Sequence, residues 1–515
     1  MQKKEELKKF AKEILKSNLV DRNKIETLKL RFAEKFGRIP LNSELLATLE
    51  DGEREELRKI LKTKPTRTLS GVAVISVMTA PFGCPGKCIY CPTVSNVPKS
   101  YTGAEPSTLR GSLCEWDPFK IVSARLKQLA AIGHSIEKCE IIVQGGTWTA
   151  LPKKYRENFI KKIFDACNGF ESKDLENAQK ANEVAKSRIV GLTFETRPDY
   201  CSKKDVKDML KLGATRVELG LQSVYDDVLK KIKRGHDLKC AKEAIKRLKN
   251  FGLKVDLHVM LGLPGTTKQK DIEMFRILFE DADLRPDGLK IYPTAVLPNT
   301  ELYEMWKKGE YKAINDEYIL DVLTEAKSKY IPEYCRIKRI MRDIPTSKIV
   351  AGYTHPNLRE YIRKKMENEN KKCRCIRCRE IGQKYKYENK LPKRQDLIIR
   401  SYDASGGKEF FISFEDSEQD ILLGFIRLRL CDKAFIRELH IYGEAAPLDM
   451  NAKLTEVAIQ HKGLGKRLLQ EAEKIAKENG YKMLYVTSGV GVRKYYASQG
   501  YVFKSPYMLK NLNKR

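Results

Sequence analysis

Apolar and polar residues follow helix and strand spacings along most of this 515-residue chain. The first 65 residues show a helical pattern, with Leu7, Phe10 and Ile14 on one face and lysines on the other. From residue 72 onward, strand-like apolar runs alternate with helical patterns. The runs are Val72–Thr79, Cys139–Gln144, Ile189–Glu195, Arg216–Gln222, Lys254–Leu263 and Gly288–Pro293. These βα units predict a parallel sheet with right-handed crossovers, either barrel-like or doubly wound.

The last part of the chain predicts a separate α/β unit. Four strand-like runs come first, namely Leu397–Tyr402, Glu409–Phe414, Ile421–Leu430 and Phe435–Tyr442. A glycine-containing loop from Gln460 to Lys466 then leads into a helix over Arg467–Asn479. Backbone N–H groups at such a helix amino terminus can bind a pyrophosphate. We therefore expect four parts: helices over 1–65, an α/β domain over 66–326, a basic linker over 327–395 and a second α/β domain over 396–515.

The charge balance is strongly basic, with 98 Lys and Arg against 68 Asp and Glu, a formal charge of +30. This excess favours a polyanionic partner, although a lysine-rich proteome would give the same composition. Basic residues gather in the amino-terminal helices and in the linker, so we expect both to contact RNA phosphates. No apolar run approaches the roughly 20 residues of a membrane helix and no signal peptide is found. We expect a cytoplasmic protein with reduced thiols.

Three cysteines follow the first predicted strand at a C-x3-C-x2-C spacing: Cys84, Cys88 and Cys91. Ligands in parallel α/β folds bind at the carboxyl ends of the strands, which is where this motif lies. Three thiolates can ligate three irons of a 4Fe-4S cluster and leave the fourth iron open for a small molecule. A zinc knuckle or reduced structural thiols are the alternatives that this spacing leaves open.

A second cysteine cluster lies in the basic linker, where Cys373, Cys375 and Cys378 form a C-x-C-x2-C motif. Three closely spaced thiolates with one distant fourth ligand suit tetrahedral zinc. We expect His355 as the fourth ligand, with Cys335 as the alternative. The competing interpretation is three free cysteines in an arginine-rich loop.

The first cysteine motif, with Tyr90 directly before its last cysteine, resembles the radical S-adenosylmethionine (SAM) enzymes. The resemblance implies that the open iron of the cluster binds SAM and that electron transfer releases a 5′-deoxyadenosyl radical. It also implies that residues at successive strand ends bind SAM. These residues are Gly145, Gly146, Glu195, Arg197 and Gln222.

The carboxy-terminal unit closely resembles the GNAT acetyltransferases, which implies acetyl-CoA as a cofactor. Its fourth strand would pair with the pantetheine arm and the glycine-containing loop would bind the pyrophosphate. The residues concerned are Glu438, Leu439, His440 and Ile441 on the strand, and Gly463, Leu464, Gly465 and Lys466 on the loop. In the following helix, Tyr496 is expected near the thioester sulfur, whereas Tyr495 is equally compatible with core packing.

The whole chain resembles the catalytic subunit family of Elongator, in its archaeal type. The match is carried by Lys64 to Arg67, Ser100 to Gly103, Gln144 to Trp148, Met341 to Pro345, Asn357 to Glu360, Arg437 to Gly443 and Gly489 to Tyr496. It implies a partial (β/α)6 radical SAM barrel and a GNAT domain, joined here by the linker whose cysteine spacing predicts zinc. Eukaryotic relatives often lack the full C-x-C-x2-C motif, so the zinc prediction comes from the cysteines of this chain and not from the resemblance. The implied enzyme is an acyltransferase that binds the anticodon stem-loop of tRNA. It would add an acetyl-CoA methyl radical to carbon 5 of wobble uridine 34, leaving a carboxymethyl group.

The same resemblance assigns a role to Lys138, which matches a lysine that reaches CoA from the second barrel strand. Lys138 and Tyr496 are therefore the predicted catalytic residues. Two rival functions remain open: a protein-lysine acetyltransferase that uses the GNAT domain alone, and a non-catalytic tRNA-binding scaffold. The intact cysteines and glycine-containing loop argue against the scaffold.

Overall fold

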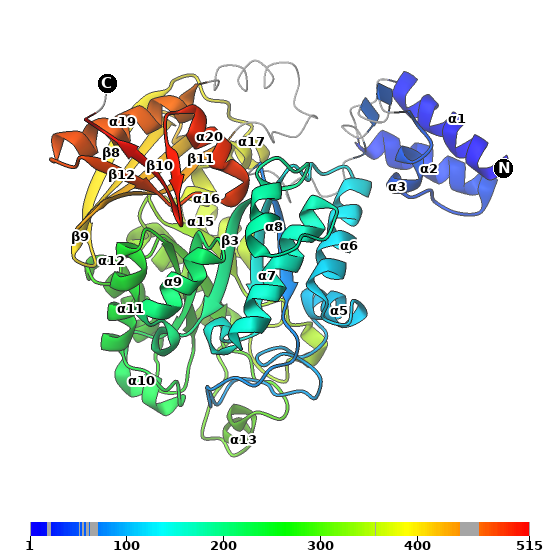
Figure 1. Ribbon diagram of the computed structural model, residues 1–515. Coiled ribbons are helices and arrows are strands. Elements are labelled where there is room, and N and C mark those ends of the chain that lie inside the picture. The colour runs from blue at the N-terminus through cyan, green and yellow to red at the C-terminus, as the bar shows by residue number, and fades with distance from the viewer. Residues whose placement is uncertain are drawn as a thin grey trace.

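A computed structural model of the chain describes residues 2–17, 22–50, 52–53, 56–57, 61, 71–355, 357–442 and 463–513 (Figure 1). The amino-terminal helices α1 (Gln2–Lys16), α2 (Arg22–Phe36) and α3 (Asn42–Leu46) have a small core of their own. Leu7, Phe10, Ala11 and Ile14 are buried in it, which confirms the predicted apolar face of the first helix. Among the described residues, no helix is both long and apolar enough to cross a membrane.

The central domain contains a sheet of parallel strands in the sequential order β1 to β7. The strands are β1 (Ala73–Met78), β2 (Lys138–Gln144), β3 (Arg188–Thr196), β4 (Arg216–Gln222), β5 (Lys254–Leu261), β6 (Gly288–Pro293) and β7 (Arg336–Ile340). In the described part of the chain, β1 and β7 do not pair, so the sheet curls without closing. The barrel-like alternative is therefore confirmed over the doubly wound one, whose strand order would reverse.

The seventh strand, β7, lies in the stretch that we expected to be a linker. Its five residues, Arg336–Ile340, include three basic ones, so the sequence contains no apolar run that would predict a strand. The structure compensates these charges across the sheet: Arg336 Nη1 lies 2.7 Å from Glu380 Oε2, and Lys338 Nζ lies 3.2 Å from Asp256 Oδ2. Part of the basic stretch is thus built into the barrel.

Helices connect the strands, and Figure 1 shows them on the outside of the barrel. They are α5 (Pro106–Leu113), α6 (Pro118–Ala131), α7 (Lys153–Asn168), α8 (Leu175–Asn182), α9 (Lys203–Lys211), α10 (Asp226–Lys231), α11 (Leu238–Asn250), α12 (Lys268–Glu280), α13 (Glu301–Lys307) and α14 (Asp316–Glu325). Side-chain caps at Asp117, Ser202, Asp237 and Thr267 begin α6, α9, α11 and α12, because each accepts a hydrogen bond from an otherwise unpaired backbone N–H. The short helices α15 (Leu358–Asn368), α16 (Ile376–Arg379) and α17 (Ile381–Glu388) follow β7.

The carboxy-terminal domain has a second sheet in the order β13-β14-β12-β11-β10-β9-β8. Its elements are β8 (Asp396–Ala404), β9 (Gly407–Asp416), β10 (Ile421–Leu430), β11 (Ala434–Ile441), α19 (Leu464–Glu478), β12 (Met483–Val486), α20 (Arg493–Ser498), β13 (Val502–Lys504) and β14 (Tyr507–Asn511). The strand β11 pairs with β12 in parallel only over Ala434–Ile436. Since β12 ends at Val486, the partner of Ile436, Glu438–Ile441 of β11 continue beyond the pairing with β12.

The two sheets meet at the amino-terminal ends of the barrel strands, through buried ion pairs. Arg437 on β11 makes two hydrogen bonds, of 2.6 and 2.7 Å, to Asp287 directly before β6. The same guanidinium lies 2.7 Å from Glu409 on β9. Gly489 packs directly against the backbone of β3, where a Cβ atom would lie 2.2 Å from the carbonyl oxygen of Val190. The carboxy-terminal domain is therefore fixed onto the barrel by charge and by close backbone packing.

Candidate active site

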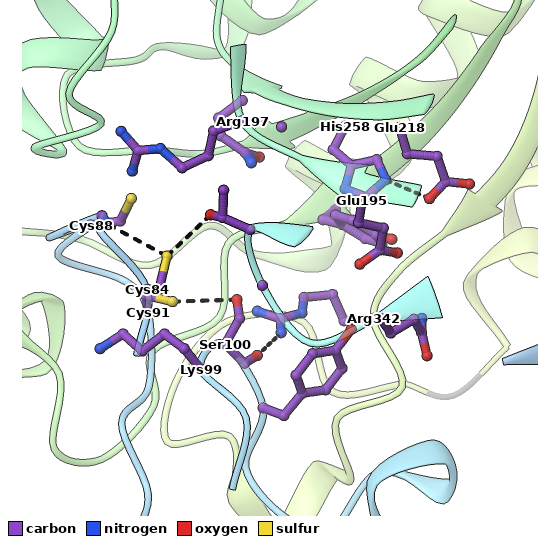
Figure 2. Close-up of a pocket in the computed structure, with 18 of the residues that line it drawn as sticks. Cys84, Cys88, Cys91, Lys99, Ser100, Glu195, Arg197, Glu218, His258 and Arg342 are labelled. Atoms are coloured by element: carbon purple, nitrogen blue, oxygen red, sulfur yellow. Dashed lines mark hydrogen bonds and ion pairs between the residues drawn. The ribbon is translucent and has the colours of Figure 1, made fainter. Parts of the chain in front are cut away.

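The three cysteines of the first motif lie together at the carboxyl ends of the barrel strands, where they line one cavity of about 150 Å³ (Figure 2). Cys84 Sγ lies 3.3 Å from Thr147 Oγ1, and Cys91 Sγ lies 3.3 Å from Ser100 Oγ. The backbone N–H of Gly86 donates to Cys84 Sγ at 3.4 Å. Hydrogen bonds to the sulfurs are typical of sites that hold an iron–sulfur cluster.

Positive charge surrounds these thiols. Arg234 is buried, and its Nη1 donates to Cys88 Sγ at 3.4 Å while its Nε donates to the carbonyl oxygen of Gly220 at 3.1 Å. Arg342 and Lys99 line the same cavity. Three thiolates around a cluster carry net negative charge, and these cations compensate it in a poorly solvated site.

The predicted SAM-binding residues converge on the same cavity. Gly146, Glu195, Arg197 and Gln222 line it. Gly145 has a φ of +132°, and a Cβ atom there would lie 1.9 Å from Thr79 Oγ1, so this turn requires glycine. Two buried polar atoms, Arg197 Nη1 and Gln222 Oε1, have no hydrogen-bond partner among the described residues. Because buried polar groups are normally paired, these atoms fit a polar ligand such as SAM.

A second cavity, of about 350 Å³, lies between the barrel interior and the carboxy-terminal sheet. Glu438 and His440 of β11 line it, on the part of the strand that continues beyond its pairing with β12. Gln144 and Arg339 line both cavities. The two sites are therefore neighbours within one barrel and share a wall that includes these two side chains.

The glycine-containing loop lies beside this part of β11. A Cβ atom on Gly465 would lie 3.6 Å from Ile441 Cγ1 and 3.1 Å from Tyr495 Oη. Gly463, Leu464, Gly465 and Lys466 begin α19, whereas Gln460, His461 and Lys462 lie outside the described residues. Leu439 and Ile441 alternate with the cavity-lining residues along β11. The arrangement fits a pantetheine arm along β11 with its pyrophosphate at the amino terminus of α19.

The two predicted catalytic residues, Tyr496 and Lys138, lie on different domains. Tyr496 on α20 is buried, which raises the pKa of its phenol above the usual range. Lys138 is the first residue of β2 and shares the face of Glu140, which lines the second cavity.

Comparison with known families finds four matching stretches of the chain. Residues 78–278 match the radical SAM superfamily, residues 286–368 its C-terminal domain, and residues 376–501 the GNAT acetyltransferase family. Residues 4–69 match the ELP3 N-terminal domain. The matches imply a 4Fe-4S cluster and SAM in the barrel, and acetyl-CoA in the carboxy-terminal domain.

Full-length relatives decide the family. The chain is 46% identical to a tRNA uridine(34) acetyltransferase of Methanocaldococcus infernus, over 98% of both chains. It is 39% identical to the Homo sapiens Elongator complex protein 3, over 96% of this chain and 93% of that protein. The chain belongs to the Elongator complex protein 3 family. A solved structure of archaeal M. infernus Elp3 with an N-terminus deletion (1–46) superimposes with a TM-score of 0.76 at 42% identity, covering 86% of this chain and 100% of that one.

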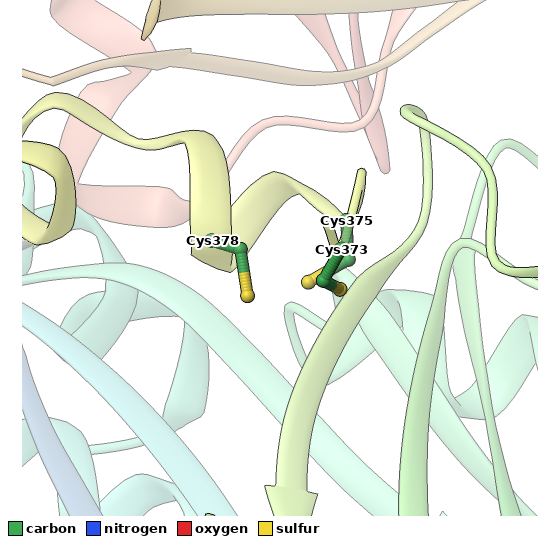
Figure 3. A group of neighbouring side chains, drawn as sticks. All are labelled: Cys373, Cys375 and Cys378. Carbon is green, nitrogen blue, oxygen red and sulfur yellow. The ribbon is translucent and has the colours of Figure 1, made fainter. Parts of the chain in front are cut away.

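In this Elongator complex protein 3 homologue, the second cysteine cluster is compact. The sulfur atoms of Cys373, Cys375 and Cys378 all lie within 4.8 Å of one another (Figure 3). The structure does not bring His355 to them, because its Nε2 lies 2.8 Å from Asp316 Oδ2 on α14. Cys335 lies near the cluster. It is buried, and its carbonyl oxygen accepts a 2.9 Å hydrogen bond from the N–H of Ile376, the residue after Cys375. Neither residue joins the three-sulfur group in the described structure.

Sequence reasoning missed the charged residues of the barrel interior. Glu218 on β4, His258 on β5 and Lys290 on β6 each lie within a run that reads as an apolar buried strand. Glu218 and His258 line the first cavity, and Lys290 lines the second. The pattern that could have located them is polar residues at every second position of parallel strands, which face the inside of a barrel.

Proposed function

We propose that this member of the Elongator complex protein 3 family is a tRNA uridine(34) acetyltransferase that uses SAM and acetyl-CoA to place a carboxymethyl group on carbon 5 of the wobble uridine. The observation that carries the proposal is the shared wall of the two cavities, which would keep both cofactors within one reaction space. The curated relatives that match the full length carry this name or that of Elongator complex protein 3.

The bound cluster and SAM would supply a 5′-deoxyadenosyl radical able to take a hydrogen atom from the acetyl methyl group. The protein's own residues would do the positioning. Cys84, Cys88 and Cys91 would hold the cluster, and Arg197 and Gln222 would offer their unpaired atoms to SAM. On the other side, β11 and the start of α19 would hold the thioester arm, which brings its methyl group into the barrel.

A protein-lysine acetyltransferase remains the second candidate function, but little supports it. Direct acyl transfer needs only the carboxy-terminal domain and an exposed path for a lysine side chain. Here the part of β11 beyond its pairing with β12 faces the barrel interior, where Glu438 Oε2 accepts a 2.9 Å hydrogen bond from Arg427 and Glu438 Oε1 lies 3.3 Å from Arg216 of β4. The thioester would therefore point toward the SAM site.

The test is nucleoside mass spectrometry. Protein reconstituted anaerobically with iron, sulfide and a reductant is incubated with SAM, acetyl-CoA and bulk tRNA. We expect a carboxymethyl mass gain on uridine that requires both cofactors. Acetylated lysine in added peptides, with unmodified tRNA, would instead support the second candidate.

A tRNA substrate implies a cytoplasmic location.

The anticodon stem-loop of the tRNA would be held through phosphate contacts by α1–α3 and the basic stretch. We expect the logarithm of the tRNA dissociation constant to rise steeply with the logarithm of salt concentration, with a slope of about 4 or more. In a K9Q/K16Q double variant of the exposed lysines on α1, the slope should fall by about 1 to 2, as measured by fluorescence anisotropy. The matched control Glu13→Gln should not lower it, and a flat salt response would contradict the proposed contacts.

We also propose zinc at Cys373, Cys375 and Cys378. Three thiolates carry excess negative charge around one divalent ion, and Lys327 Nζ lies 3.8 Å from Cys378 Sγ to compensate it. Cys375→Ser should lose the metal, as measured by elemental analysis of the purified protein. His355→Ala should keep it, because this side chain is paired with Asp316. If His355→Ala lost its zinc, His355 would be the fourth ligand, as the sequence predicted.

A further inference from the structure

The proposed reaction needs a group that receives a proton. When a carbon radical has added to carbon 5 of uridine, that carbon carries both its hydrogen and the new substituent, and the unpaired electron lies on carbon 6. The hydrogen must leave as a proton to restore the double bond. We propose that His258, paired with Glu218, is the acceptor of this C5 proton, an inference that rests on the proposed function.

The position of His258 supports this role. It lines the first cavity from β5, and Figure 2 shows it with Glu218 and Glu195 on the side of the cavity opposite Cys84 and Cys88. The cluster would occupy the cysteine side and SAM would extend from it to Glu195, its predicted partner, which leaves His258 for the substrate. The His258 side also faces the wall shared with the second cavity, because Glu195 Oε1 lies 3.0 Å from Lys290 Nζ, and Lys290 lines that second cavity.

The hydrogen bonds of His258 leave one ring nitrogen available. Nε2 lies 3.0 Å from Glu218 Oε2, so in the neutral ring this nitrogen carries the proton and donates it. Nδ1 then has a free lone pair, and it makes no hydrogen bond in the described part of the chain. A carboxylate behind the first nitrogen orients the ring and stabilises the cation that forms when the second nitrogen takes a proton.

The charge on Glu218 is maintained by its surroundings. Burial opposes ionisation, but the ammonium of Lys290 and the hydrogen bond from His258 hold the pKa of Glu218 well below its usual value. Burial also opposes the charge of Lys290, and the carboxylates of Glu218 and Glu195 nevertheless hold its pKa well above the usual value. Glu218 Oε1 is buried without a hydrogen-bond partner among the described residues, which is costly unless a ligand or product group completes the site.

A metal ion is the other occupant that these residues could accept, because ligand atoms of Glu195, Glu218 and His258 all lie within 4.8 Å of one another. The ammonium of Lys290 already contacts both carboxylates and supplies the positive charge that a metal would bring. An acid–base pair is therefore favoured over a metal site.

The step balances in atoms and electrons. The C5–H bond breaks and its proton goes to His258 Nδ1. The two electrons of that bond and the unpaired electron on carbon 6 make three electrons. Two of them form the C5=C6 double bond. The third would be taken up by the oxidised iron–sulfur cluster that Cys84, Cys88 and Cys91 would hold, which is the electron acceptor that the proposed reaction itself supplies.

The test separates proton removal from radical formation. Substrate tRNA is prepared with deuterium at carbon 5 of uridine, and both 5′-deoxyadenosine and modified uridine are quantified. In His258→Gln we expect 5′-deoxyadenosine formation at the wild-type rate and a loss of about 100-fold or more in modified uridine, the usual contribution of a general base. The deuterated substrate should slow this variant further and leave the wild type unaffected.

Glu218→Gln, the second variant, should show the same split and isotope effect, and it decides the matter where His258→Gln does not fold. His134→Gln is the matched control, since His134 is also a buried histidine but precedes β2 at the other end of the barrel.

Loss of 5′-deoxyadenosine in His258→Gln would overturn the inference by making His258 a SAM ligand. Unchanged modification or no isotope effect would overturn it too. If the wild type itself modifies no uridine, the proposed function fails instead.

Discussion

Cys88→Ser should abolish both SAM cleavage and uridine modification. The thiol of Cys88 lines the cavity with Cys84 and Cys91 and accepts a hydrogen bond from Arg234, so its loss removes one of three ligands from the cluster. We expect the purified variant to lose most of its iron and its visible absorption. Nucleoside mass spectrometry should find modified uridine reduced by about 1,000-fold or more, because without the cluster no radical forms to activate the acetyl methyl group.

The matched control for this variant is Cys240→Ser. Cys240 lies on α11, half-buried and outside both cysteine clusters, so its replacement should leave iron content and modification unchanged. The comparison also separates the two candidate functions. A protein-lysine acetyltransferase would survive Cys88→Ser with full activity.

Arg437→Leu should destabilise the protein more than any surface substitution. The guanidinium is fully buried and binds both Asp287 and Glu409, so leucine would remove the counterion that these two buried carboxylates share. Among the ion pairs of the described residues, Asp287 would keep only its 3.5 Å contact with Arg427, and Glu409 only its contact with Arg429. Removing one partner of a buried ion pair typically costs about 3–5 kcal/mol. We expect a clear fall in the thermal unfolding midpoint, together with faster proteolysis between the barrel and the carboxy-terminal domain.

Arg276→Leu is the control for this effect. Arg276 on α12 also pairs with two carboxylates, those of Glu273 and Glu280, but at the surface, where solvent screens the charges. Its replacement should leave the midpoint nearly unchanged. Equal midpoints for the two variants would show that the interface does not depend on its buried charges.

Much of the fold could be predicted from the periodicity of the chain. The strands Arg216–Gln222 and Gly288–Pro293 have the predicted bounds, and helices lie between the strands, as the alternating pattern predicted. Parallel strands in a covered sheet are continuous apolar runs, which is a strong local pattern. The strands β7, β13 and β14 are short, and β7 is basic, so their existence depends on partners that only the tertiary fold supplies.

The site was predictable where a motif stands at the end of a strand. The cysteines, Gly146, Glu195, Arg197 and Gln222 share one cavity because parallel strands bring their carboxyl ends together. No local pattern identifies a distant fourth zinc ligand, and the fold pairs His355, the predicted one, with Asp316 of α14 instead. Glu218, His258 and Lys290 escaped notice because the strands were identified by their apolar residues, whereas these charges lie at the alternate positions that face the barrel interior.

The central claim is that the acetyl methyl group, bound by the carboxy-terminal domain, reacts with a radical made in the barrel. Acetyl-CoA deuterated in its methyl group tests it most directly, with tRNA, SAM and the reconstituted wild-type protein. The account predicts deuterium in the recovered 5′-deoxyadenosine and the remaining methyl deuterium in the carboxymethyl group of uridine. Deuterium-free 5′-deoxyadenosine alongside modified tRNA would contradict it.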